Sequence, residues 1–239
     1  MSNSRALVIK SIKQGETSSI VSCYLEEIGF KSFIVKGLYG QKKSKFSRAH
    51  FFPLNFINLN YTYNEKRELG YIKEVKPEIL YKTLHVNIQK SSVTVFLSEI
   101  LYSVFREELE VNNNLFNFLF RSLMWYDKIP ECNIYHIKFL IELSKYIGFY
   151  PNIINDHDIY FCLESGSTTN TKPLGINING VDLKLLKNLL GMEFEDLNSM
   201  SISKMSRVRI LNYLIDYYSL HLQMFKTPKS INVFTQVFK

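Results

Sequence analysis

The first third of the chain has the hydrophobic pattern of β-strands. The clearest segment is residues 51–63, in which Ile57, Leu59 and Tyr61 alternate with polar residues. This period of two places one strand face on a core and the other face toward water. Apolar residues before Ile57 have the opposite parity. The pattern therefore predicts one long strand with a β-bulge between Phe56 and Ile57.

Four shorter segments are also rich in β-branched and aromatic residues, namely residues 6–12, 18–25, 30–36 and, more weakly, 69–75. Gly15, Gly29, Gly37 and Gly40 fall between these segments, where turns are needed. Five short strands in about 75 residues, without a helical pattern among them, are typical of a small closed β-barrel such as the OB-fold.

After Pro77 the apolar residues recur at the helical period of 3.6. The pattern predicts helices at residues 93–105, 115–126, 134–147, 181–190 and 204–222, which together would form a bundle. Residues 148–180 lack this period and contain several prolines and glycines. We therefore expect an α+β protein: a five-stranded OB-fold barrel at residues 1–78, and an α-helical domain at residues 79–239 with an irregular excursion at about residues 149–180.

The positive charge of the chain is concentrated in the predicted barrel. The whole chain of 239 residues carries a formal charge of +7, of which residues 1–80 contribute +6 and residues 81–239 contribute +1. Residues 28–64 contain no acid at all but hold six bases, which are Lys31, Lys36, Lys42, Lys43, Lys45 and Arg48. Such a patch complements a phosphate backbone, because its neutralisation releases counterions.

The tightest part of this patch is the loop at residues 39–46. Lys42, Lys43 and Lys45 lie between Tyr39 and Phe46 in a segment with a glycine. Nucleic-acid bases could stack on the two rings while the lysines follow the phosphates. The alternative is a solvated loop that only keeps the protein soluble.

Other chemistry has weak signals in this sequence. Cys23, Cys132 and Cys162 are far apart, which predicts neither a disulfide framework nor a cysteine zinc site. The triplet at residues 156–158 is more typical of a polar turn than of a metal site. P-loop and G-x-S-x-G motifs are absent. The longest apolar run has five residues, 159–163, so we expect no membrane span and a cytoplasmic protein.

Several short fragments, in their order and spacing, resemble the RecO family of bacterial recombination mediators over roughly residues 5–151. They are Gly15-Glu16-Thr17-Ser18-Ser19-Ile20-Val21, Val35-Lys36-Gly37, Lys43-Ser44-Lys45-Phe46, Phe52-Pro53-Leu54, Leu115-Phe116 and Ile147-Gly148-Phe149-Tyr150-Pro151. The resemblance implies an N-terminal OB-fold, a C-terminal helical domain and a nucleoid-associated location. It also implies binding to single- and double-stranded DNA, annealing of complementary strands and, with RecR, loading of RecA onto strands coated by single-strand-binding protein, whose C-terminal tail docks on the helical domain.

The sequence departs from the family at one place. Many members carry a four-cysteine zinc knuckle after the Gly-Phe-x-Pro element, whereas residues 152–175 contain Cys162 alone. We therefore expect no metal and no cofactor. The resemblance assigns DNA contacts to Lys36, Lys43 and Lys45, and the charge pattern adds Lys42 and Arg48, with Tyr39 and Phe46 as stacking rings.

Our hypothesis from the sequence is a non-enzymatic DNA-binding and annealing protein. One alternative is a protein-interaction adaptor whose basic barrel binds an acidic protein partner. A metal-dependent nuclease is weaker, because no carboxylate cluster near the basic loop could hold the ions.

Overall fold

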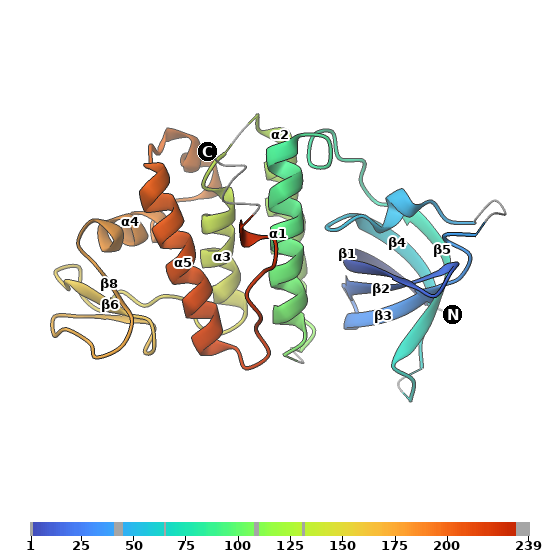
Figure 1. Cartoon of the computed structure of the whole chain (residues 1–239), viewed down its shortest axis with the longest axis horizontal. Helices are drawn as coiled ribbons and strands as arrows, with labels where there is room; N and C mark the ends of the chain where they lie inside the picture. The colour runs from blue at the N-terminus through green and yellow to red at the C-terminus, as the bar shows by residue number, and fades with distance from the viewer. Residues whose placement is uncertain (1, 41–44, 65, 108–109, 131, 233–239) are drawn as a thin grey trace. The chain divides into compact units, whose positions relative to one another are not determined.

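The computed structural model describes residues 2–40, 45–64, 66–107, 110–130 and 132–232. The chain forms two compact units (Figure 1). The first unit comprises residues 1–127 and 228–230, and the second comprises residues 128–227 and 231–239. The first unit thus contains the barrel and its following helices. The boundary at residue 78, where strands give way to helices, stays a prediction as a domain boundary.

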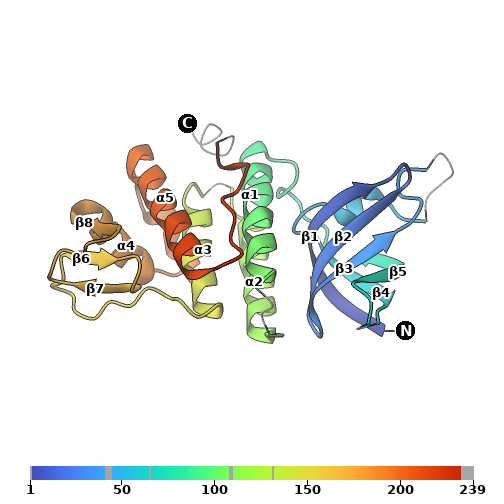
Figure 2. The ribbon, with the colours of Figure 1, turned by 60° about the horizontal axis from the view of Figure 1, so that its bottom comes forward.

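The first five strands form a closed barrel in the order β1-β2-β3-β5-β4 (Figure 2). They are β1 Ser2–Gln14, β2 Ser18–Leu25, β3 Gly29–Val35, β4 Phe56–Thr62 and β5 Leu69–Pro77. All neighbouring strands pair antiparallel except β3 and β5, which are parallel. The predicted five-stranded barrel followed by helices is confirmed.

The barrel is filled by the inward-facing residues of the strands. Fully buried members are Ala6, Val8, Val21, Cys23, Leu25, Phe33, Val35, Ile57 and Leu59. Burial of the Cys23 thiol raises its pKa. Apolar side chains therefore fill the interior of the barrel, as the alternation in the sequence predicts.

Strand β4 is shorter than predicted, and the expected bulge between Phe56 and Ile57 is wrong. A 3₁₀ helix, η1 Arg48–Phe51, and a turn precede the strand. Within the turn Leu54 has a φ of 61°, which is incompatible with an extended strand. The pairing of β1 with β4 passes through Phe56 without a shift; the register shifts are between Asn60 and Tyr61, and between Val8 and Lys10.

The change of parity at Phe56 has a different cause. Phe56 points out of the barrel toward helix α2 Asn113–Lys128, with its ring 5.5 Å from that of Phe116 and 5.1 Å from that of Phe120. Tyr24 likewise stacks on Phe105 of helix α1 Ile88–Phe105 at 4.3 Å between ring centroids. Part of the outer barrel surface is therefore a second apolar face, covered by these helices.

A buried carboxylate holds the segment that connects the barrel to α1. Asp127 of α2 accepts hydrogen bonds from the backbone N–H groups of Lys82, Thr83 and Leu84 at 2.8–2.9 Å. Lys90 is 2% exposed, and its Nζ donates to the hydroxyl of Thr83 at 2.6 Å and to the carbonyl of Asp127 at 3.2 Å. The connector is thus fixed by a satisfied buried network.

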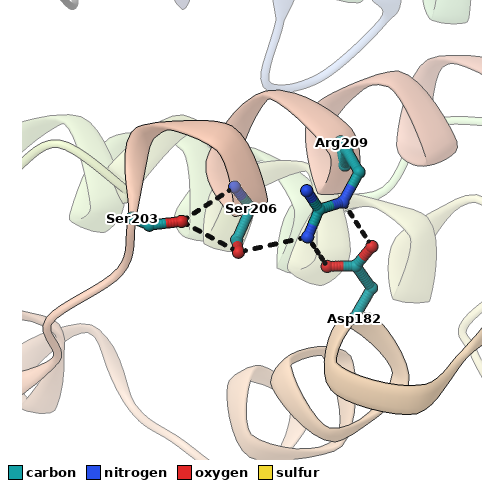
Figure 3. Close-up of polar contacts among 4 residues, drawn as sticks. All are labelled: Asp182, Ser203, Ser206 and Arg209. Carbon is teal, nitrogen blue, oxygen red and sulfur yellow. Dashed lines mark hydrogen bonds and ion pairs between the residues drawn. The ribbon is translucent and has the colours of Figure 1, made fainter.

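The second unit is built on the helices α3 Tyr135–Tyr146, α4 Gly180–Leu190 and α5 Lys204–His221, with a 3₁₀ segment, η2 Phe194–Ser199. The guanidinium of Arg209 on α5 makes two hydrogen bonds to the carboxylate of Asp182 in the first turn of α4, at 2.7 and 2.9 Å (Figure 3). Ser203 caps α5 by accepting from the backbone N–H of Ser206. The bidentate pair joins α5 to α4, and the cap satisfies a backbone N–H in the first turn of α5.

Residues 148–180, expected to lie outside the helical pattern, contain short strands. They contain a three-stranded antiparallel sheet of β6 Tyr160–Cys162, β7 Ser167–Thr169 and β8 Asn177–Asn179. Helix α5 anchors the segment, because Tyr217 donates to the carbonyl of Phe149 at 2.7 Å and His221 lies 2.8 Å from the carbonyl of Leu163. The sequence did not predict these strands, because three-residue strands are too short to show a period.

Within the described residues, no helix is both long enough and apolar enough to cross a membrane.

Candidate nucleic-acid interface

The turn between β1 and β2 meets the loop after β3 at one end of the barrel. Gly15 and Gly37 adopt φ values of 63° and 73°, which a residue with a side chain rarely adopts. The two segments are joined by a hydrogen bond of 2.9 Å from the backbone N–H of Tyr39 to the carbonyl of Thr17. This contact fixes the start of the predicted basic loop on the barrel.

Two cations lie on the Tyr39 ring at this end. Lys13 Nζ is 5.5 Å from the ring centroid, and the guanidinium carbon of Arg48 is 5.2 Å from it. Tyr39 itself is partly buried against the barrel core. The Tyr39 ring therefore orders two positive charges, one from the end of β1 and one from η1, through cation–π attraction.

Two other predicted lysines also lie near aromatic rings. Lys36 Nζ is 5.6 Å from the centroid of Tyr71 on β5, and Lys45 Nζ is 6.0 Å from the centroid of Phe46. Phe46 packs edge-on against the buried Phe51 at 6.2 Å between ring centroids. The cations are thus spread over several rings rather than gathered at one point, which is suited to an extended polyanion.

Ion pairing distinguishes these cations from Arg5. Within the described residues, neither Lys13, Lys36, Lys45 nor Arg48 is in an ion pair. Arg5 differs, because it pairs with both Glu26 and Glu78 at 3.2 Å and serves the barrel itself. The positive potential of the loop end is therefore available to an external anion.

The structure brings some of the predicted site residues together and leaves others apart. Tyr39 and Arg48 are in contact, while Lys36 and Lys45 each lie against a different ring. Lys42 and Lys43 are outside the described residues.

Sequence reasoning missed Lys13 and Tyr71. Both were outside the acid-free stretch, and only the pairing of β1 with β2 and of β3 with β5 places them beside it. The sequence signal that could have found Tyr71 is a large aromatic residue between Gly70 and Lys73 in a predicted strand. In the structure the Tyr71 side chain is 42% exposed.

The described titratable groups do not form a metal-binding cluster at this end. In the described part of the chain, no group of three or more His, Cys, Asp or Glu side chains is placed to hold a metal ion. His85 lies 2.7 Å from the amide oxygen of Asn55, and burial lowers its pKa. The arrangement can attract and align an anionic polymer by charge, and its aromatic rings can contact bases.

Comparison with known proteins places both parts of the chain in one family. Residues 1–80 match the family model described as "Recombination protein O N terminal", and residues 85–230 match "Recombination protein O C terminal". The chain is 34% identical to the "DNA repair protein RecO" of Flavobacterium psychrophilum, over 98% of both chains. It is also 34% identical to the protein of that name from Flavobacterium johnsoniae, over 98% of both chains, and 32% identical to that of Phocaeicola vulgatus, over 97% of both. With matches to both domains and full-length relatives, the chain belongs to the RecO family of DNA repair proteins.

Proposed function

We propose that this protein binds single- and double-stranded DNA through the basic end of its barrel and anneals complementary strands without catalysing a chemical reaction. The observation that carries the proposal is the set of cations Lys13, Lys36, Lys45 and Arg48, which lie against aromatic rings and lack ion-pair partners in the described residues. Membership of a DNA repair family supports it.

Annealing requires two negatively charged strands to approach while their base edges stay free to pair. A cationic surface that contacts phosphates meets this requirement, because it screens the repulsion and carries no sequence information. Lys42 and Lys43, proposed from the sequence as further DNA contacts, are outside the described residues. The rings of Tyr39 and Phe46 support the cations in this arrangement.

Family membership, rather than a site in this structure, supports the partners that we propose. We propose that the protein acts with RecR to help load RecA onto single strands coated by single-strand-binding protein, and that the second unit docks the C-terminal tail of single-strand-binding protein. With this activity we propose a location at the nucleoid in the bacterial cytoplasm.

The salt dependence of DNA binding tests the assignment of the surface. For a single strand, the slope of log K against log salt is about −0.7 per phosphate contact. Replacement of Lys36, Lys45 and Arg48 by alanine should therefore flatten the slope by up to about 2 units. The matched control replaces Lys145, Lys172 and Lys184, which are exposed in the second unit, and so removes the same charge.

The control variant should keep the slope of the wild-type protein. Equal slopes in both variants would contradict the assignment of the barrel end. Tight binding of an acidic protein together with salt-insensitive, negligible DNA binding would instead favour the adaptor.

A further inference from the structure

Asn55 holds the backbone of η1, the 3₁₀ helix that carries Arg48. Its side-chain amide donates to the carbonyl of Ala49 at 2.7 Å and lies 3.5 Å from the carbonyl of His50. The backbone of Asn55 is itself fixed on the barrel, because its carbonyl accepts from the N–H of Val8 at 2.9 Å. A 3₁₀ helix of four residues closes few hydrogen bonds of its own. The position of η1 therefore depends on contacts from outside the helix.

The Asn55 side chain is oriented in turn by His85, in the connector that precedes α1. His85 Nε2 lies 2.7 Å from Asn55 Oδ1. Because the Asn55 amide nitrogen donates to a backbone carbonyl, Oδ1 is the acceptor in this pair and His85 Nε2 carries the proton. The imidazole packs edge-on against the rings of Phe52 and Tyr81, at 5.8 and 5.6 Å between ring centroids. His85 is thus a hydrogen-bond donor with a fixed orientation.

The connector supports His85 through two further sets of hydrogen bonds. Asp127 accepts from the backbone N–H groups of the three residues directly before His85. Tyr81 donates its hydroxyl to the carbonyl of Leu54 at 3.0 Å, directly before Asn55 in the chain. Hydrogen bonds therefore join the connector to η1 by way of residues 54 and 55.

Arg48 is at the start of η1, and its place on the Tyr39 ring depends on where that helix lies. The Arg48 side chain is exposed, and its guanidinium carbon is 5.2 Å from the ring centroid. A cation–π contact at an exposed site is weak, so it does not fix the helix by itself. Phe51 anchors the last residue of η1 in the barrel core. The Asn55 amide instead holds the carbonyl of Ala49, which directly follows Arg48.

We propose that His85 and Asn55 are positioning residues for DNA binding, which hold the backbone beside Arg48 so that its guanidinium stays on the Tyr39 ring, oriented toward phosphates. The inference rests on the proposed DNA binding by the basic end of the barrel, and gives a role in it to two side chains that do not contact DNA. An arginine that is ordered before binding loses less conformational entropy when it binds. Both residues therefore act on affinity through Arg48.

A double-mutant cycle on the affinity for an oligothymidine tests this dependence. Arg48→Ala should flatten the slope of log K against log salt by about 0.7, because one phosphate contact is lost. Asn55→Ala should weaken binding by roughly 2- to 10-fold, the cost of ordering one long side chain on binding. It should keep the wild-type salt slope, because every charge remains. In the Arg48→Ala background, Asn55→Ala should change the affinity by less than about twofold.

Three further variants separate positioning from a general effect on the fold. His85→Ala should weaken binding as Asn55→Ala does, whereas His85→Gln keeps an N–H donor and should restore most of the affinity. Asn60→Ala is the matched control, since it removes another amide of the barrel, one that donates to Asn3 at 2.8 Å. This control should bind oligothymidine within about twofold of its parent in both backgrounds.

Three outcomes would overturn the positioning role while leaving DNA binding intact. They are wild-type affinity of Asn55→Ala, an equal loss from Asn55→Ala with and without Arg48, and wild-type affinity of Arg48→Ala. The second outcome is also the one expected if Asn55→Ala only disturbs the fold. Absence of binding to oligothymidine by the wild-type protein would instead reject the proposed function, and this inference with it.

Discussion

Replacement of Asp127 by asparagine should destabilise the first unit, because the carboxylate is the hub of the connector between barrel and helices. It is 5% exposed and accepts from three consecutive backbone N–H groups and from the hydroxyl of Thr83. Asparagine retains one acceptor oxygen but turns an NH₂ group toward the N–H of Lys82. One charge-assisted bond, worth about 1.5–3 kcal/mol, is lost, and the others become weaker. We expect the free energy of unfolding to fall by about 3 kcal/mol.

The single tryptophan provides the assay, because Trp125 is on α2 two residues before Asp127. Its fluorescence during urea denaturation gives the midpoint and slope from which the change in free energy is obtained. Asp216→Asn, an exposed change on α5, is the matched control and should have an effect within about 0.5 kcal/mol. A midpoint for Asp127→Asn equal to that of the control would refute the role of Asp127.

The same carboxylate predicts a pH dependence. Burial alone raises the pKa of Asp127, but the hydrogen bonds from Lys82, Thr83 and Leu84 outweigh burial and hold it below its usual value. Its contribution to stability is therefore complete above the unfolded pKa of about 3.9 and is lost as the pH falls through the folded pKa. The asparagine variant should lose less stability than the wild-type protein on acidification below about pH 4.

Two further predictions concern the second unit. Burial and the charge of Arg207 lower the pKa of His136 to about 3. Its contribution to the free energy of unfolding is therefore present above the unfolded pKa of about 6.5 and declines as the pH falls toward 3, by at most about 1.4 kcal/mol per pH unit. Urea titrations from pH 7 to 4 should show a shallower decline in stability for His136→Gln than for the exposed His157→Gln, and equal declines would contradict the assignment. Gly166→Ala should lower the free energy of unfolding by more than Gly15→Ala. The two glycines have nearly equal φ values of 64° and 63°, so the backbone strain of the substitution is similar at both. An added Cβ would lie 2.6 Å from the Tyr217 hydroxyl at Gly166, whereas at Gly15 it would meet nothing within 4 Å. Thermal unfolding of both variants measures the difference, and a larger effect at Gly15 would reject the packing argument.

The barrel could be predicted from the sequence because its strands are defined by local patterns. Residues 18–25 were expected to form a strand, and β2 has those bounds, since β-branched residues lie between two turns. The start of β4 could not be predicted in this way. Phe51, Leu54 and Phe56 all have apolar side chains that are buried, yet they belong to a 3₁₀ helix, a left-handed turn and a strand, and the local period does not distinguish these environments.

The candidate site was predictable only in part, for a similar reason. The absence of acids at residues 28–64 pointed to the loop that holds Tyr39 and Arg48. Lys13 and Tyr71 are brought to this loop and to the outer face by strand pairing over long sequence distances.

The rate at which the protein pairs complementary oligonucleotides in the absence of nucleotide tests the proposed function most directly, both on bare strands and on strands coated with single-strand-binding protein. The wild-type protein and the variant lacking Lys145, Lys172 and Lys184 should accelerate pairing at low salt. The variant lacking Lys36, Lys45 and Arg48 should lose most of this acceleration. No acceleration by the wild-type protein at any salt concentration, or equal acceleration by the two variants, would contradict annealing by the basic end of the barrel.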